Sequence, residues 1–164
     1  MEIYILRHGI AVERGTPGYK RDGDRPLTDE GVEKMRQIAK AMREMDLQFD
    51  VIFSSPYVRA KATADIVAET LGENVTLTDS LLPEADPAEL IDEINDEKPQ
   101  RVLLVGHEPD LSALISTLIC GKRNADIELK KGGLAKLTAE TLTYGKCATL
   151  NWLLTPKQLR KMGS

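Results

Sequence analysis

The chain has 164 residues, a formal net charge of −4, 41% hydrophobic residues and 29% charged residues. This length is typical of one domain, which buries roughly 70% of the surface that its unfolded chain would expose. The acidic balance argues against a general binder of nucleic acid or anionic membrane, because both require a positive field. No apolar run approaches the roughly 20 residues of a membrane span. With no recognisable signal peptide, the expected location is the cytoplasm.

The two cysteines, Cys120 and Cys147, form no CxxC pair, and we expect both to be reduced and buried.

Short apolar runs alternate with longer amphipathic stretches along the chain. Strands are expected, in chain order, at Ile3–Leu6, Val51–Phe53, Val75–Leu77, Arg101–Val105, Gly133–Ala139 and Ala148–Leu153. Helices are expected at Asp29–Met45, Pro56–Leu71, Pro87–Glu97 and Pro109–Ile119. The alternation predicts a single α/β domain over residues 1–164, with a mostly parallel central sheet and helices on both faces.

The helix starts are set by recognisable capping residues. Thr28 is expected to cap the first helix, with acidic Asp29 and Glu30 complementing the helix dipole. Ser55 is expected to cap the second helix, with Pro56 in its first position, and Gly72 is expected to end it.

Three of the expected strands lead directly into polar motifs. These are Arg7-His8-Gly9, the segment from Ser54 to Arg59, and Gly106-His107-Glu108-Pro109. In a parallel sheet the carboxyl ends of the strands lie along one edge, and ligands bind in the crevice there. We therefore expect Arg7, His8, Arg59 and His107, which include both histidines of the chain, to meet at that edge.

Two arginines and two histidines in one crevice suit a tetrahedral dianion. Guanidinium groups donate paired hydrogen bonds to phosphate oxygens, and a neutral imidazole can attack phosphorus to become a covalent phosphoryl carrier. Phosphoryl transfer depends mainly on positioning and charge stabilisation of this kind. The residue types therefore predict phosphoryl-group chemistry.

The order of these motifs resembles the histidine phosphatase superfamily, also called the phosphoglycerate mutase-like family. The small size and the segments Arg25-Pro26-Leu27-Thr28-Asp29-Glu30-Gly31, Ser54-Ser55-Pro56 and Gly106-His107-Glu108-Pro109 are similar to its SixA-type branch, the phosphohistidine phosphatases. The matches extend from Met1 to about Ile119. Arg-His-Gly alone recurs by chance, whereas the ordered set is specific.

The resemblance implies a role for each matching residue. His8 attacks phosphorus, Arg7 and Arg59 hold the phosphoryl oxygens, and His107 stabilises the transition state. Arg25 and Gly9 are expected to contact the substrate. The resemblance implies a phosphatase without metal or cofactor, acting on a phosphorylated protein with a phosphohistidine domain or on a small phosphorylated molecule.

Larger members of this superfamily carry a carboxylate proton donor, for which Glu84 is the candidate here. Its flanking sequence matches the donor motif poorly. An alkoxide leaving group needs a proton, whereas imidazole, whose conjugate acid has a pKa of about 6.5, leaves more readily. A displaced donor therefore favours phosphohistidine over a phosphate ester.

Other interpretations of these residues stay open at this point. Glu84 and Asp86 fit solvated acids before a helix, Glu108 and Asp110 fit the start of the next helix, and Lys130-Lys131 fits a solvated turn. A zinc site is disfavoured because adjacent arginines would repel the cation. The alternative functions are a small-molecule phosphomonoesterase and a phosphate- or phosphoprotein-binding module without turnover. A mutase is disfavoured by the short chain.

Overall fold

The computed structural model describes residues 1–164 and contains one six-stranded sheet. The strand order is β3-β2-β4-β1-β5-β6, so that the first strand lies inside the sheet. The strands are β1 (Glu2–Arg7), β2 (Val51–Ser54), β3 (Val75–Leu77), β4 (Arg101–Gly106), β5 (Leu134–Ala139) and β6 (Ala148–Leu154). β1 to β4 pair in parallel, whereas β5 is antiparallel to both β1 and β6. The mostly parallel sheet predicted from the sequence is thus confirmed, with an antiparallel extension at one side.

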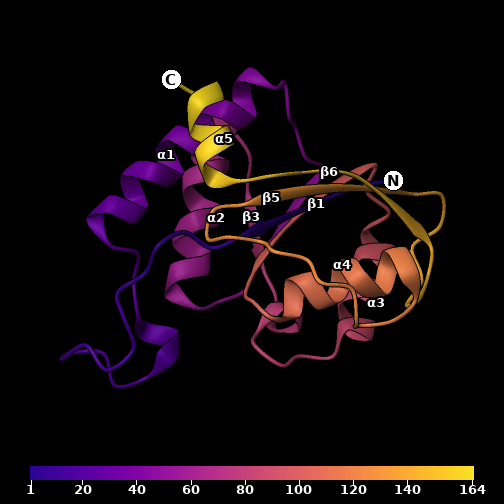
Figure 1. The fold of residues 1–164 in the computed structure, drawn as a ribbon, viewed down its shortest axis with the longest axis horizontal. Helices are drawn as coiled ribbons and strands as arrows, with labels where there is room; N and C mark the ends of the chain where they lie inside the picture. Colours follow the sequence, from indigo (N-terminus) through magenta and orange to yellow (C-terminus); the bar gives the residue numbers. More distant parts are fainter.

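Helices cover both faces of this sheet (Figure 1). On one face lie α1 (Asp29–Glu44), α2 (Val58–Leu71) and α5 (Pro156–Met162), and on the other lie α3 (Pro87–Glu97) and α4 (Asp110–Cys120). Two short 3-10 helices, Asp22–Asp24 and Asp79–Leu81, lie in the connections. The connection between β1 and α1 projects away from the sheet. None of the helices is long and apolar enough to cross a membrane.

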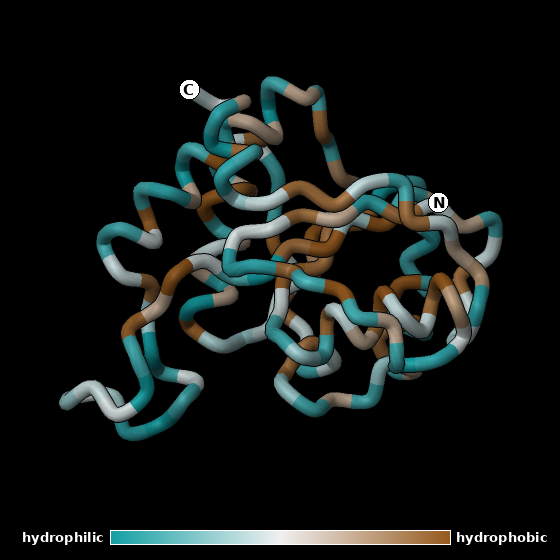
Figure 2. Tube along the Cα trace, viewed as in Figure 1, coloured by the Kyte–Doolittle hydropathy of each residue, from teal (hydrophilic) through white to brown (hydrophobic).

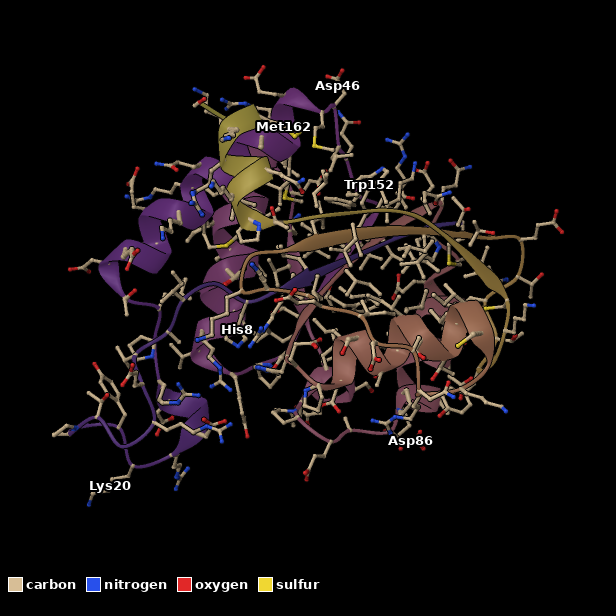
Figure 3. All side chains as sticks on the ribbon, viewed as in Figure 1. His8, Lys20, Asp46, Asp86, Trp152 and Met162 are labelled. Carbon is tan, nitrogen blue, oxygen red and sulfur yellow. The ribbon has the colours of Figure 1, made fainter.

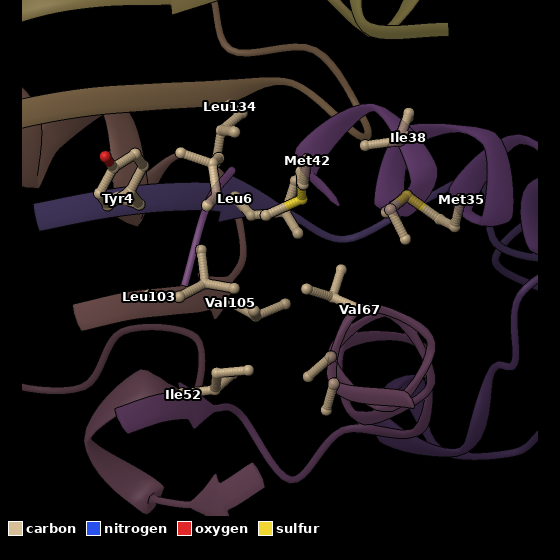
Figure 4. Packing of buried hydrophobic residues seen from close by; sticks show 14 of the residues in the cluster. Tyr4, Leu6, Met35, Ile38, Met42, Ile52, Val67, Leu103, Val105 and Leu134 are labelled. Atoms are coloured by element: carbon tan, nitrogen blue, oxygen red, sulfur yellow. The ribbon is translucent and has the colours of Figure 1, made fainter. Parts of the chain in front are cut away.

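Alternation along the strands divides the core between the two faces. In β1, Tyr4 and Leu6 belong to a cluster of 19 buried residues on the face covered by α1, α2 and α5. Figure 4 shows part of this cluster, including Met35 and Val67. Ile3 and Ile5 face a second cluster of 18 buried residues shared with α3 and α4. Burial of β1 on both faces explains its nearly continuous apolar sequence, and Figure 2 shows the apolar residues gathered along the strands.

Most expected elements are present within one or two residues, but the start of α2 is a correction. Thr28 caps α1 by accepting the Gly31 amide, as expected. Ser55 does not cap α2: the N-cap is Tyr57, and the helix begins at Val58. The expected end of α2 is confirmed, because Gly72 adopts φ 73° at its C-cap.

Two further features differ from the expectations. α5 was not predicted, although a capping box between Thr155 and Gln158 with Pro156 at its start marks it in the sequence. Both cysteines are free, but the expectation of burial was wrong: Cys120 is exposed and Cys147 is half-buried. Cys120 ends α4 at the surface, so its position in an apolar helix did not determine its burial.

Candidate active site

A pocket of about 310 Å³ opens at the carboxyl ends of β1 and β4. Its walls bring together Arg7, His8, Arg25, Arg59 and His107 from segments far apart in the chain. His8 immediately follows β1, and His107 follows β4, which lies beside β1 in the sheet. Figure 3 shows His8 between the two helical layers, with Lys20 on the projecting connection. Arg7, His8, Arg59 and His107, which strand topology predicted to lie together, therefore line one pocket.

The His8 ring is held in one tautomer. Its side chain is buried, and Nδ1 lies 2.7 Å from the carbonyl oxygen of Gly9. Because a carbonyl can only accept, Nδ1 carries the proton and Nε2 keeps its lone pair. Burial, with smaller contributions from nearby cations, lowers the pKa of His8 to about 3. His8 is therefore a neutral imidazole with an unprotonated Nε2 at physiological pH.

Gly9 connects this ring to the start of α2. Its amide donates to Thr63 Oγ1 at 3.0 Å, and the Thr63 hydroxyl donates to the carbonyl of Arg59 at 2.7 Å. Both backbone polar groups of Gly9 are thus engaged within the protein. A Cβ at this position would lie 2.7 Å from Met35 Cγ, so a side chain has no room. The geometry gives Gly9 a positioning role, and its expected substrate contact stays a prediction.

Arg59 lies at the centre of the site. Its Nε donates to His8 Nε2 at 3.3 Å, Nη1 donates to the carbonyl of Asp22 at 2.7 Å, and Nη2 donates to Asp22 Oδ2 at 3.0 Å. The side chain is only 4% exposed. Burial lowers the pKa of Arg59, although the Asp22 carboxylate favours its charged form. Arg59 therefore presents a fixed positive charge to the unprotonated nitrogen of His8, which accepts its hydrogen bond.

Asp22 also binds Arg25, the residue expected to contact substrate. Arg25 donates to Asp22 Oδ1 from Nε at 2.9 Å and from Nη2 at 2.7 Å, and Arg14 approaches the same oxygen at 3.4 Å. Burial opposes the charge of Asp22, but hydrogen bonds from Arg25 and Arg59 outweigh it and lower its pKa to about 2. One carboxylate thus orders the arginines along this side of the pocket.

His107 faces His8 across the pocket, with ring centroids 5.3 Å apart. Its Nε2 lies 2.8 Å from Ser55 Oγ, which also accepts the Tyr57 amide at 3.2 Å. Its Nδ1 is buried without a hydrogen-bond partner. Burial first, and then the charge of Arg59, lower the pKa of His107 to about 4. A second neutral imidazole therefore lines the site.

Arg7 closes the pocket on the side of β5. Its Nη1 donates to the carbonyl of Leu129 at 3.1 Å, and its Nε is buried without a hydrogen-bond partner. Burial lowers the pKa of Arg7, and the charge of Glu108 partly offsets this effect. Lys131 lines the same pocket. The site thus contains a cation on each side of His8.

The structure does not bring Glu84 into the pocket. Glu84 is exposed, adopts φ 66°, and its amide donates to Asp110 Oδ2 at 2.8 Å. Glu108 does line the pocket, but its carboxylate accepts hydrogen bonds from the amide and hydroxyl of Ser112 at 2.8 and 2.6 Å. These bonds agree with the expected role of Glu108 at the start of α4.

Sequence reasoning did not assign several residues to the site, among them Asp22, Lys131 and Ser55. Asp22 lies in a polar connection with no distinguishing signal, and Lys131 belongs to a Lys-Lys turn that fits a solvated surface. Ser55 belonged to the predicted polar motif from Ser54 to Arg59 but was assigned only the role of a helix cap. Its position directly after β2, level with the histidine motifs, was the signal that could have placed it at the site.

A model of the histidine phosphatase superfamily (branch 1) matches residues 3–86 of the chain. The chain belongs to this superfamily, as the motifs predicted. An uncharacterized protein of Picosynechococcus sp. is 34% identical over 141 residues, which cover 84% of each chain.

Two further comparisons place the chain near SixA. Phosphohistidine phosphatase SixA of Escherichia coli K12 is 25% identical over 167 residues, covering 98% of this chain and 97% of SixA. The structure of protein histidine phosphatase SixA complexed with tungstate superposes with a TM-score of 0.82 at 24% identity, covering 97% of this chain and 99% of that one. The chain therefore shares the SixA fold over 97% of its length.

Proposed function

We propose that the chain is a phosphohistidine phosphatase that acts on a phosphorylated protein in the cytoplasm, without a metal or cofactor. The observation that carries this proposal is the fixed tautomer of His8, whose unprotonated Nε2 accepts a hydrogen bond from Arg59. A pocket that only bound phosphate would not need a neutral nucleophile. The nearly full-length similarity to SixA of Escherichia coli supports the same reaction.

In the first step, the hydrogen bond from Arg59 to His8 Nε2 is released, and the lone pair of Nε2 attacks phosphorus. The substrate imidazole reacts with its other ring nitrogen protonated, so the electron pair of the breaking P–N bond goes to a neutral imidazole leaving group while a P–Nε2 bond forms on His8. Arg7, Arg59 and His107 hold the phosphoryl oxygens as negative charge shifts among them. In the second step, water attacks phosphorus, the P–Nε2 bond breaks, and inorganic phosphate leaves. His8 returns to its neutral form.

The position of Glu84 agrees with an imidazole leaving group. An imidazole needs little help from a general acid, because its conjugate acid has a pKa of about 6.5. Glu84 is exposed, and the carboxylate of Glu108 is engaged with Ser112. The arrangement therefore favours a P–N substrate.

A small-molecule phosphomonoesterase is the second candidate. The observation in its favour is that Glu13 and Glu108 both line the pocket, where a carboxyl group could protonate an alkoxide. This candidate predicts faster turnover of phosphate esters than of phosphohistidine.

The test compares phosphate release from a phosphohistidine protein and from p-nitrophenyl phosphate. We expect faster release from the first substrate, an acid-labile phosphoenzyme in the wild type, and loss of both activities in His8→Ala with an unchanged circular dichroism spectrum. A chelator should have no effect. Activity retained in a folded His8→Ala protein would contradict the nucleophile, and activity lost with chelator and restored by zinc would contradict a metal-free mechanism.

Two glutamate variants separate the candidate functions. Glu84→Gln and Glu108→Gln remove one carboxylate each, outside and inside the pocket. A phosphomonoesterase that uses Glu108 as its acid would lose turnover of an alkyl phosphate such as glycerol 2-phosphate in Glu108→Gln, because an alkoxide leaving group needs a proton and p-nitrophenolate does not. A comparable loss in Glu84→Gln would instead restore Glu84 as the proton donor. Absence of turnover on both substrates, with phosphate still bound, would favour the binding module.

A further inference from the structure

A second cavity, of about 330 Å³, adjoins the active-site pocket. α1 and α5 form one part of its wall, and the turn before β5 forms another. It shares Arg7 and Lys131 with the active-site pocket but contains neither His8 nor His107. Its volume falls within the range of sites that bind small organic molecules, roughly 300–1,000 Å³.

The cavity has an apolar floor and a positively charged rim. Met35 and Ile38 of α1 are buried beneath it, and Pro156 of α5 adds a third apolar surface. Five basic residues line it and no acidic residue does: Arg7, Lys34, Lys130, Lys131 and Arg160. In a chain of net charge −4, this local concentration of positive charge is unusual.

Carboxylates neutralise little of this positive charge. Lys34 pairs with exposed Glu30 at 2.7 Å, but no salt bridge engages Arg7, Lys130, Lys131 or Arg160. Arg7 Nε is also buried without a hydrogen-bond partner. Unpaired cations around an apolar floor of low dielectric constant attract an anion more strongly than the same cations on an open surface.

The surrounding backbone fixes the rim. The Gly132 amide donates to the carbonyl of Arg7 at 3.0 Å, and the Arg7 amide donates to the carbonyl of Gly133 at 3.2 Å, so the turn is tied to β1. Gly132 has φ 82°, and a Cβ there would lie 2.9 Å from Ile38 Cδ1. The capping box at Thr155 orders the start of α5, which carries Arg160. Because both segments are anchored, the cavity is a preformed site.

We propose that this cavity binds a small organic anion. Its acidic group would lie among Lys34, Lys130, Lys131 and Arg160, and its apolar body would lie against Met35, Ile38 and Pro156. The proposal concerns binding and does not require His8 to be catalytic. The anion could be the distal part of the phosphorylated substrate or a separate effector, and both would present the same chemistry to these residues.

Arg7 connects the two cavities. Its side chain lines both, so an anion in the second cavity lies near a residue that we propose holds the phosphoryl group. A bound ligand would therefore alter the affinity for phosphate, with a reciprocal effect of phosphate on the ligand.

The test uses naphthalene-2-sulfonate, an apolar ring system with one anionic group that the enzyme cannot hydrolyse. Its binding to the full chain is measured by isothermal titration calorimetry, with tungstate filling the active-site pocket. We expect binding to persist, and to weaken about tenfold or more in Lys34→Gln/Arg160→Gln. Lys40→Gln/Lys161→Gln is the matched control, because it removes two exposed charges from the same helices outside the cavity. The control should bind like the wild type.

Three outcomes would overturn the proposal: no binding, abolition of binding by tungstate, or equal weakening in the two double variants. A kinetic arm then distinguishes the sources of the anion. In this arm naphthalene-2-sulfonate is added to the assay with p-nitrophenyl phosphate. An increase in KM at unchanged kcat indicates that the cavity holds the distal part of the substrate. A change in kcat indicates a separate effector. If the chain has no phosphatase activity, the calorimetric result still decides the proposal.

Discussion

At the scale of single residues, the site depends on hydrogen bonds that fix the two histidines. The Gly9 carbonyl leaves the His8 lone pair on Nε2, and Ser55 holds His107 through its Nε2. Neither interaction involves a charged partner. Burial therefore keeps both imidazoles neutral, and the surrounding arginines provide the positive charge that a phosphoryl group requires.

Ser55→Ala tests the support of His107. We expect kcat to fall about tenfold to a hundredfold because the ring loses its orientation. Stability should fall by about 1–2 kcal/mol because a buried hydrogen bond is lost. Steady-state kinetics and urea unfolding measure the two effects.

Ser54→Ala is the control for this prediction. Ser54 is equally buried, but its hydroxyl donates to the Ser55 carbonyl and contacts neither histidine. It should lose similar stability and keep its kcat. An equal loss of kcat in both variants would show that Ser55 acts only through the fold.

The sequence was sufficient to identify two arginines and two histidines of the site but not how they are held. Arg7, His8, Arg59 and His107 follow strands whose parallel order brings them together. Asp22 enters from a connection whose path depends on tertiary contacts, so no periodicity could have located it. Glu84 lies outside the pocket, and its flanking sequence, which matches the donor motif poorly, gave no sign of where its side chain lies; its role as a proton donor stays a prediction.

At the scale of secondary-structure elements, α1 is positioned by a close backbone contact. The Thr28 amide donates to the Ile10 carbonyl at 2.9 Å, so the helix begins directly against the segment that follows His8 and Gly9. An added Cβ at Gly31 would lie 2.1 Å from that carbonyl oxygen. The first turn of α1 and the nucleophile segment are therefore fixed together.

Gly31→Ala tests this contact. Alanine favours an α-helix over glycine by about 1 kcal/mol, so a substitution with free space would stabilise the protein. We expect the reverse here, a loss of about 1–3 kcal/mol, because the added methyl group meets backbone atoms. Urea unfolding provides the measurement. Lys40→Ala, at an exposed position of α1, should stay within about 0.5 kcal/mol of wild type. A stabilised Gly31→Ala protein would contradict the close contact.

Elements with strong periodicity and caps were predictable. The expected Pro87–Glu97 helix has the observed bounds, because Asp86 caps it and Pro87 starts it. The start of α2 was misplaced because Ser55 resembles a cap but its hydroxyl contacts His107. α5 has only 7 residues, too few for periodicity to show.

At the scale of the whole molecule, the neutral histidines couple stability to pH. The unfolded chain binds protons at histidine near pH 6.5, whereas His8 and His107 in the folded protein do so only near 3 and 4. Between these limits the unfolded state holds more protons, so stability decreases as pH falls. Asp22 adds to this loss only at the acid end of the window, because its contribution is lost below its unfolded pKa of 3.8.

We therefore expect the free energy of unfolding to fall from pH 7 to pH 5, by up to about 1.4 kcal/mol per pH unit for each histidine. Glu73 opposes this slope near its lower end, because burial raises its pKa. Urea unfolding at several pH values measures the slope. His8→Asn/His107→Asn should have a flatter profile, and an unchanged slope in that double variant would contradict the assignment.

The central position of β1 also determines when the site can assemble during synthesis. β1 is translated first, yet both of its neighbours, β4 and β5, are made much later, and the Arg7 amide pairs with Gly133. A nascent chain thus carries His8, the proposed nucleophile, long before it has the strands that hold it. Until β5 leaves the ribosome, an apolar strand with open edges remains exposed to misassembly. Activity should emerge only when most of the polypeptide has been translated.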